Sequence, residues 1–144
     1  MKSGPFTLVG TSLTGKTIGI MGLGRIGFAT AKRFKAFDTE IIYSSRTEKE
    51  EGKSIGAKFV TFDKLLTDSD IIIITSSFND DTKGIFNKEA FEKMKTTAFI
   101  VNTSRGGLIN QPNLIEALKV LIVKSVPLKR IVTCCIWIKE YLDK

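Results

Sequence analysis

The chain of 144 residues fits one domain with a substantial core. Its 42% hydrophobic and 26% charged residues exclude extensive disorder, and its apolar runs are too short to span a bilayer. It contains no histidine, which excludes a histidine general base, a Ser-His pair and most zinc sites, so we predict no metal. The formal charge of +7 is spread among Asp and Glu without an arginine-rich tract, which favours a surface attractive to a phosphorylated cofactor over nucleic-acid binding.

The first predicted element is a short apolar strand that passes into a helix through three glycines with the spacing GxGxxG, namely Gly22, Gly24 and Gly27. Gly22 permits a tight turn, Gly24 lets the backbone approach a diphosphate, and Gly27 lets the helix pack closely on the strand. The free N–H groups and positive dipole end of the helix then face the anion. A glycine-rich turn without a ligand is the alternative, but the flanking strand and helix favour a nucleotide site.

Helices and strands alternate along the rest of the chain. We predict helices at residues 25–36, 63–66, 87–94 and 112–119. We predict further strands at residues 40–44, 58–60, 71–75 and 98–102, and a charged connection at residues 47–56. This order predicts an α/β fold with a doubly wound parallel sheet of the Rossmann type, in which ligands bind at the carboxyl ends of the strands.

Three local signals support these elements. The β-branched run at residues 71–75 is typical of a strand buried on both faces of a parallel sheet. Asn87 suits the N-cap of one helix, and Pro112 suits the first turn of another. For the helix at residues 25–36 we predict an apolar face that consists of Ile26, Ala29, Phe34 and Phe37.

Ser45 and Arg46 follow the strand at residues 40–44, where NAD-specific domains usually carry an acidic side chain about twenty residues beyond the glycines. A serine hydroxyl and a guanidinium can bind a 2′-phosphate that a carboxylate would repel. The sequence therefore favours NADP(H), with NAD(H) possible. Thr47 and Lys49 could assist, and the alternative is that all four are solvated loop residues.

Small hydroxyl residues follow the strand at residues 71–75, namely Ser76, Ser77 and, further on, Thr82. They leave room for a cofactor and can hydrogen-bond to it, although ordinary turn chemistry explains them equally well.

Arg105 and two glycines follow the strand at residues 98–102. This places a guanidinium at the ligand edge of the sheet, where it can bind a carboxylate bidentately. A surface arginine in a turn is the alternative.

In their order and intervals, these motifs resemble the D-isomer-specific 2-hydroxyacid dehydrogenases, and most closely the glyoxylate/hydroxypyruvate reductases, over about residues 5–119. The resemblance implies an oxidoreductase with a nicotinamide cofactor. By this resemblance, Gly24, Arg25 and Ile26 hold the pyrophosphate of the cofactor. Arg46 and its neighbours hold the adenosine side, and Ser77 and Thr103 line the rest of the cofactor.

The resemblance also makes Arg105 the catalytic arginine. In the family this residue binds the carboxylate of a 2-oxo acid and polarises its carbonyl while hydride arrives from the nicotinamide. A small 2-oxo or 2-hydroxy acid substrate and a homodimer are implied as well.

Beyond Lys119 the sequence departs from the family pattern, which continues into a glycine-rich strand ending in an aspartate, a catalytic glutamate and a proton-donating histidine. No position matches the glutamate or the histidine, and we expect the family's separate substrate domain to be missing. We therefore divide the chain into an entry linker (1–15), an NAD(P)-binding domain (16–119) and a divergent tail (120–144), and expect weak or no turnover. The alternative is a dinucleotide-sensing regulatory or partner-binding protein of the corepressor type.

The tail contains adjacent cysteines, Cys134 and Cys135, whose spacing fits neither a disulfide framework nor a metal site. A partner-binding or membrane-associated segment is one interpretation, but we expect loose packing or a substitute sixth strand at residues 131–138. The N-terminus carries a lysine without a secretory apolar core, so we expect a cytoplasmic location.

Overall fold

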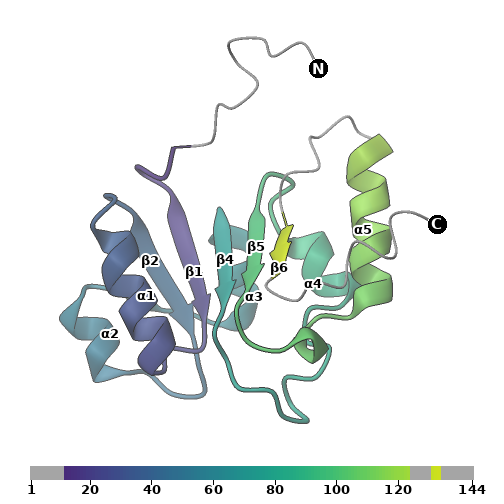
Figure 1. Cartoon of the computed structure of the whole chain (residues 1–144). Coiled ribbons are helices and arrows are strands. Elements are labelled where there is room, and N and C mark those ends of the chain that lie inside the picture. The colour runs from purple at the N-terminus through teal and green to yellow at the C-terminus, as the bar shows by residue number, and fades with distance from the viewer. Residues whose placement is uncertain (1–11, 124–130, 134–144) are drawn as a thin grey trace.

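The computed structural model describes residues 12–123 and 131–133, over which six strands form one parallel sheet in the order β3-β2-β1-β4-β5-β6 (Figure 1). The strands are β1 (Thr17–Met21), β2 (Glu40–Ser44), β3 (Lys58–Phe59), β4 (Ile71–Ile74), β5 (Phe99–Asn102) and β6 (Ile131–Thr133). The chain runs outward from β1 to β3, then crosses back to β4 and runs outward in the other direction. The predicted doubly wound sheet is thus confirmed, with its switch point between β1 and β4.

Helices connect these strands and cover both faces of the sheet (Figure 1). They are α1 (Arg25–Lys35), α2 (Glu50–Ser54), α3 (Phe62–Asp68), α4 (Lys88–Lys93) and α5 (Gln111–Val123), with a short 3-10 helix (Gly106–Leu108) before α5. None of the helices in the described part of the chain combines the length and the apolar character that crossing a membrane requires.

The core lies on both faces of β4, because successive side chains of a strand point to opposite sides. Ile72 and Ile74 belong to a buried cluster that includes Leu65 of α3 and residues of α4 and α5. Ile73 joins a second cluster, which includes Ala31 of α1 and residues of β1 and β2. The isoleucines of β4 therefore contribute to the cores on both faces of the sheet, as predicted for a strand buried on both faces.

The predicted apolar face of α1 is partly wrong. Ile26 is 66% exposed and Phe37 is 54% exposed, and Phe37 lies beyond the end of the helix. The buried residues of α1 are instead Gly27 and Ala31. Phe34 is partly buried and packs against the second cluster, as predicted. The small side chains of Gly27 and Ala31 let the helix approach the sheet closely.

One predicted connection and one predicted helix end also need correction. The charged segment at residues 47–56 contains the helix α2, which was not predicted, and α5 continues to Val123 instead of ending near Lys119. Most other bounds differ from the predicted ones by one or two residues. The predicted N-cap is confirmed, because the Asn87 side chain accepts a hydrogen bond of 3.0 Å from the backbone N–H of Ala90.

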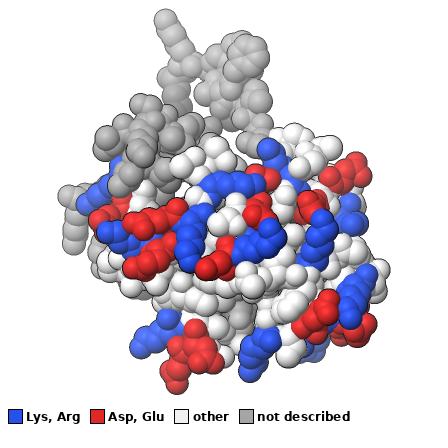
Figure 2. Space-filling model, turned by 180° about the vertical axis from the view of Figure 1, so that it is seen from behind, with Lys and Arg blue, Asp and Glu red and all other residues white. Residues whose placement is uncertain are grey.

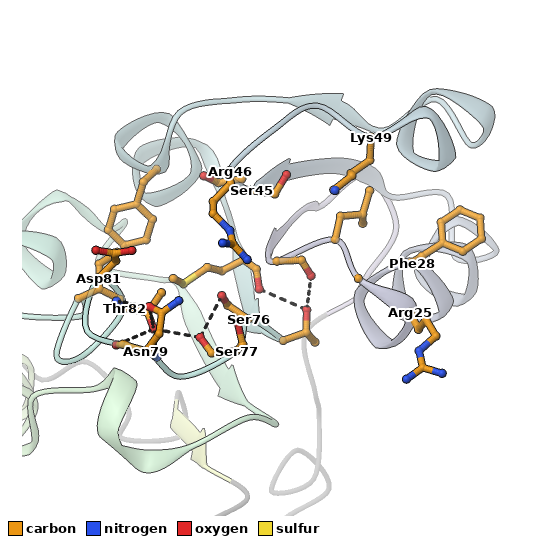
Figure 3. Close-up of a pocket in the computed structure, with 18 of the residues that line it drawn as sticks. Arg25, Phe28, Ser45, Arg46, Lys49, Ser76, Ser77, Asn79, Asp81 and Thr82 are labelled. Carbon is orange, nitrogen blue, oxygen red and sulfur yellow. Dashed lines mark hydrogen bonds between the residues drawn. The ribbon is translucent and has the colours of Figure 1, made fainter.

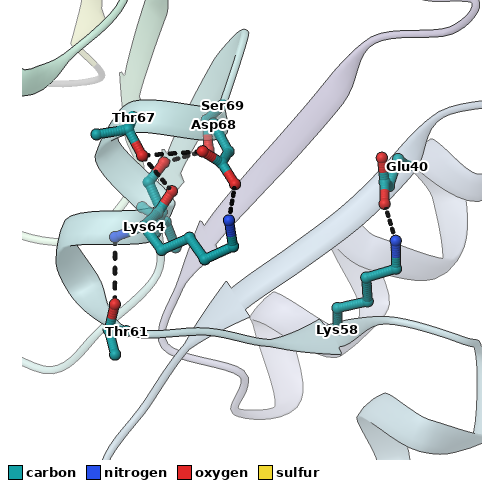
Figure 4. Close-up of polar contacts among 8 residues, drawn as sticks. Glu40, Lys58, Thr61, Lys64, Thr67, Asp68 and Ser69 are labelled. Carbon is teal, nitrogen blue, oxygen red and sulfur yellow. Dashed lines mark hydrogen bonds and ion pairs between the residues drawn. The ribbon is translucent and has the colours of Figure 1, made fainter.

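Polar contacts fix the outer part of the sheet and α3 (Figure 4). Thr61 caps α3 by accepting a hydrogen bond of 3.3 Å from the backbone N–H of Lys64, and the Lys64 side chain pairs with Asp68 at 2.7 Å. Glu40 of β2 pairs with Lys58 of β3. Such exposed pairs contribute about 0–1 kcal/mol each. Positive and negative side chains are interspersed over the face that Figure 2 shows.

The tail contributes β6, which pairs in parallel with β5 through the register Ile100 with Ile131 and Asn102 with Thr133. The predicted sixth strand is confirmed for these residues. Residues 134–138 of that strand, Cys134 and Cys135 among them, lie outside the described residues, as do residues 1–11 of the predicted linker.

Candidate nucleotide site

A cavity of about 800 Å³ lies at the carboxyl edge of the sheet, beside the switch point between β1 and β4 (Figure 3). Four segments line it: the glycine loop with the start of α1, the end of β2 with the following loop and α2, the start of α3, and the loop after β4. Its size is that of a small-molecule or cofactor pocket. Open α/β sheets bind their ligands at this position.

The three glycines of the loop serve three different purposes. Gly22 has a φ of +93°, and a Cβ there would lie 2.7 Å from the Cα atom of Ser76. A Cβ on Gly27 would lie 2.2 Å from the carbonyl oxygen of Gly22, so this glycine lets α1 pack on the loop. At Gly24 nothing lies within 4 Å of the Cβ position, and the residue lines the cavity. The backbone at Gly24 is therefore open to a ligand.

The first turn of α1 is suited to an anion. Gly24 is its N-cap residue and makes no side-chain capping bond, and the first turn contains no acidic residue. The first N–H groups of the helix and its positive dipole end are thus available to a negatively charged group. Arg25 and Phe28 of this helix line the cavity beside Gly24.

The loop after β2 brings two cations to the cavity. Figure 3 shows the side chains of Arg46 and Lys49 extending from this loop, with Ser45 between them. Within the described residues neither cation takes part in an ion pair. The Ser45 hydroxyl donates a hydrogen bond of 2.6 Å to the Thr47 carbonyl, which shapes the loop. Both charges are therefore free to meet an anionic ligand.

The loop after β4 forms the opposite wall with Ser76, Ser77, Asn79 and Thr82 (Figure 3). The Thr82 hydroxyl donates to the Ser77 carbonyl at 2.9 Å and accepts from the Asn79 N–H at 2.9 Å. A second hydrogen bond joins the same two residues, because the side-chain oxygen of Asn79 accepts from the Thr82 N–H at 3.0 Å. Thr82 thus stabilises the turn, which is the ordinary turn chemistry that the sequence left open.

Five of the predicted site residues lie outside the lining: Ile26, Gly27, Thr47, Thr103 and Arg105. Ile26 is exposed on α1, and Gly27 is buried beneath the loop. Thr47 is exposed and contributes its carbonyl to the turn with Ser45. The Thr103 hydroxyl donates a hydrogen bond of 3.0 Å to the Ile74 carbonyl, so it joins β5 to β4.

Arg105 is exposed, and its guanidinium donates a hydrogen bond of 3.2 Å to the Ser104 carbonyl. Buried Asn102 fixes the loop that carries it, because the Asn102 amide donates to the Arg105 carbonyl and accepts from the Ser104 N–H, both at 2.9 Å. The Ser104 hydroxyl also donates to the carbonyl of Ser76, a lining residue. Arg105 therefore lies on a loop that is attached to the wall of the cavity.

Sequence reasoning missed several lining residues, namely Phe62, Thr75, Asn79, Asp81, Ile85 and Glu51. Glu51 lies in the unpredicted helix α2, so no pattern placed it near the site. Thr75 was predicted only as the last residue of a strand. Its place at the carboxyl end of that strand could have indicated that it lies at the ligand edge of the sheet.

A family model described as "D-isomer specific 2-hydroxyacid dehydrogenase, NAD binding domain" matches residues 2–127. The chain belongs to this family. Domains of this family bind a nicotinamide dinucleotide, and the open backbone at Gly24 with the uncapped start of α1 fits the diphosphate of such a cofactor.

Relatives of known sequence and structure agree with this assignment. The chain is 42% identical over 125 residues to a "Putative 2-hydroxyacid dehydrogenase" from Staphylococcus epidermidis, an alignment that covers 86% of this chain and 39% of the relative. It is 40% identical to a glyoxylate reductase from Paecilomyes thermophila, with a TM-score of 0.74 over 78% of this chain and 34% of the other. For D-lactate dehydrogenase from Escherichia coli the identity is 33% and the TM-score 0.78, over 80% and 37% of the two chains. This chain thus spans little more than a third of the length of each of these proteins.

Proposed function

We propose that this domain binds NADP(H) in preference to NAD(H). The observation that supports this preference is the placement of Arg46 and Lys49 beside Ser45 at the end of β2, with both cations facing the cavity and free of ion pairs within the described residues. A 2′-phosphate on the adenosine ribose would meet a guanidinium, an ammonium and a hydroxyl there. Glu51 and Asp81 lie in the same lining and oppose this attraction, but the three lining cations, Arg25, Arg46 and Lys49, outnumber them.

We propose positions for the remaining parts of the cofactor as well. The diphosphate lies over Gly22, Gly24 and Arg25 at the start of α1, where N–H groups are available. Ser76 and Ser77 line the path from the diphosphate toward the Arg105 loop. Thr82 and Thr103 support this wall through their bonds to backbone carbonyls, and Ile26 flanks the diphosphate from the exposed side of α1.

We also propose that the domain serves a reductase of small 2-oxo acids. The bound cofactor supplies hydride for this chemistry. Arg105 lies on a loop attached to the cavity wall, where a fixed cation can bind the carboxylate of the substrate and stabilise charge on its carbonyl oxygen. The 40% identity to a glyoxylate reductase supports glyoxylate as the substrate, and the resemblance of the sequence motifs adds hydroxypyruvate as the alternative. Because the 144 residues contain no histidine, a histidine proton donor would have to come from outside them.

Isothermal titration calorimetry of the purified chain with NADPH and NADH tests the cofactor assignment. We expect both to bind, with NADPH the tighter by about ten-fold or more, as charge-assisted contacts to one phosphate would give. Equal affinities would contradict the role of Arg46, and no binding of either would contradict the nucleotide site itself. Oxidation of NADPH with glyoxylate at an ordinary enzyme rate would contradict the expectation of weak or no turnover.

A further inference from the structure

The hydroxyl group of Thr75 lies directly beneath the glycine loop. It donates a hydrogen bond of 2.6 Å to the carbonyl oxygen of Gly22 and lies 3.2 Å from the carbonyl oxygen of Met21. A threonine hydroxyl has one proton, and the shorter contact shows that Gly22 is its main acceptor. Thr75 also lines the cavity, so this contact joins β4 to the wall of the nucleotide site.

The peptide groups of Gly22 are held from two sides of the switch point. Its N–H donates a hydrogen bond of 2.8 Å to the Ser44 carbonyl at the end of β2, and its carbonyl accepts from Thr75 at the end of β4. On the third side lies α1, since a Cβ on Gly27 would lie 2.2 Å from this carbonyl and 2.8 Å from the Thr75 hydroxyl oxygen. The Gly22 carbonyl is therefore enclosed among three elements.

This enclosure matters because Gly22 has a φ of +93° and is followed after one residue by Gly24, which faces the cavity with no neighbour at its Cβ position. The orientation of the Gly22 carbonyl determines where the chain turns toward Gly24 and the first turn of α1. Diphosphate binding depends on the direction of N–H groups in that turn. A displacement of less than an ångström lengthens several hydrogen bonds at once.

We propose that Thr75 is a positioning residue for the dinucleotide: its hydroxyl fixes the Gly22 carbonyl and thereby aims the N–H groups at Gly24 and the start of α1 toward the diphosphate. This inference rests on the dinucleotide binding proposed above. The competing explanation is that the bond only stabilises the fold. The two differ in whether the loss of the hydroxyl changes affinity beyond its effect on stability.

The test compares Thr75→Val, which keeps the shape and removes the hydroxyl, with Thr75→Ser, which keeps the hydroxyl. Thr39→Val is the matched control, because Thr39 is buried and its hydroxyl donates a hydrogen bond of 2.8 Å to the Phe34 carbonyl at the far end of α1. Dissociation constants for NADPH and NADH are measured by calorimetry, and unfolding midpoints by circular dichroism.

We expect T75V to weaken both dinucleotides by a similar factor of about ten, equivalent to about 1.4 kcal/mol, because both contain the diphosphate. T75S and T39V should stay within about two-fold of the wild type, although T39V lowers the unfolding midpoint about as much as T75V does. If T75V does not fold, the dinucleotide affinities of Thr75→Ala and T75S are compared instead.

A hydroxyl-free variant that binds both dinucleotides as tightly as the wild type would overturn the positioning role and leave the proposed function intact. A wild-type chain that binds neither would overturn both. An equal loss of affinity in T39V and T75V would also overturn the inference, because it would show that affinity follows stability alone.

Discussion

The hydroxyl group of Tyr43 accepts a hydrogen bond of 2.9 Å from the backbone N–H of Lys49 and lies 3.3 Å from the Lys49 carbonyl, to which it donates. Tyr43 is fully buried in β2, so these bonds attach the loop that carries Arg46 and Lys49 to the core. The same ring packs on α2, where a Cβ on Gly52 would lie 2.7 Å from it. The position of both cations therefore depends on one buried phenol.

Replacement of Tyr43 by Phe tests this dependence. The ring and its contact with Phe59, at 5.5 Å between centroids, remain, but the Lys49 backbone loses its partner. We expect the free energy of unfolding to fall by about 1 kcal/mol, measured by urea denaturation. NADPH affinity should fall more than NADH affinity, because the loop meets the 2′-phosphate. An equal effect on the two dinucleotides would contradict the link between Tyr43 and the 2′-phosphate site.

Arg46→Ala tests the assignment of the 2′-phosphate directly. We expect NADPH binding to weaken by about ten-fold or more and NADH binding to stay within about three-fold, as calorimetry can measure. Arg46→Lys keeps the charge but loses the bidentate geometry, so its NADPH affinity should lie between the two. Arg33→Ala is the control for net charge, because Arg33 is exposed on α1, bonds the Ala29 carbonyl and lies outside the cavity lining. A similar loss in R33A would indicate a long-range charge effect in place of a local contact.

Gly24→Ala and Gly27→Ala should have opposite consequences. At Gly24 the φ of −88° suits any residue and the Cβ position is open, so we expect stability within about 1 kcal/mol of the wild type. The methyl group would stand where the diphosphate approaches, so affinity for both dinucleotides should fall by at least about ten-fold. At Gly27 the Cβ meets a backbone oxygen that cannot move freely, and we expect destabilisation of about 1–3 kcal/mol or more. Thermal unfolding and calorimetry separate the two, and normal dinucleotide affinity in G24A would contradict the placement of the diphosphate.

The features that the sequence predicted well depend on neighbours along the chain. The glycine spacing from Gly22 to Gly27 requires a strand before it and a helix after it, and both are present as β1 and α1. The apolar run of β4 and the N-cap at Asn87 are local in the same way. Such patterns are set by backbone geometry and periodicity within a few residues, which a single sequence contains.

The features that it did not predict depend on contacts between distant segments. Thr75 and Gly22 are 53 residues apart, and their hydrogen bond exists only because β4 lies beside β1. The helix α2 has a charged sequence without apolar periodicity and is placed by Gly52 against Tyr43. Ile26 was assigned to the core by its position in a helical pattern, but the closeness of Gly27 to the loop decides which side of α1 faces inward.

Asp70 lies directly before β4, at the amino ends of the strands and thus opposite the cavity. Its carboxylate accepts hydrogen bonds of 2.9 Å from the Thr17 N–H and 3.0 Å from the Lys95 ammonium. Burial raises the pKa of this carboxyl, but the Thr17 N–H and the hydrogen bond and charge of Lys95 together outweigh it, so the pKa lies below the ordinary value of 3.8. The ionised form is therefore the one that the folded state favours.

Because the pKa of Asp70 is lower in the folded state than in the unfolded state, its contribution to stability is present above the unfolded value and is lost as the pH falls through the folded value. We expect Asp70→Asn to be less stable than the wild type at pH 7, and the difference to narrow as the pH falls below about 4. Urea unfolding of both proteins between pH 7 and pH 2.5 measures this difference in stability. Asp63→Asn is the control, since Asp63 forms an exposed pair with Lys93 at 2.8 Å and should change stability by less than about 1 kcal/mol. A difference between the wild type and D70N that stays constant over this range would contradict the role of the ionised carboxylate.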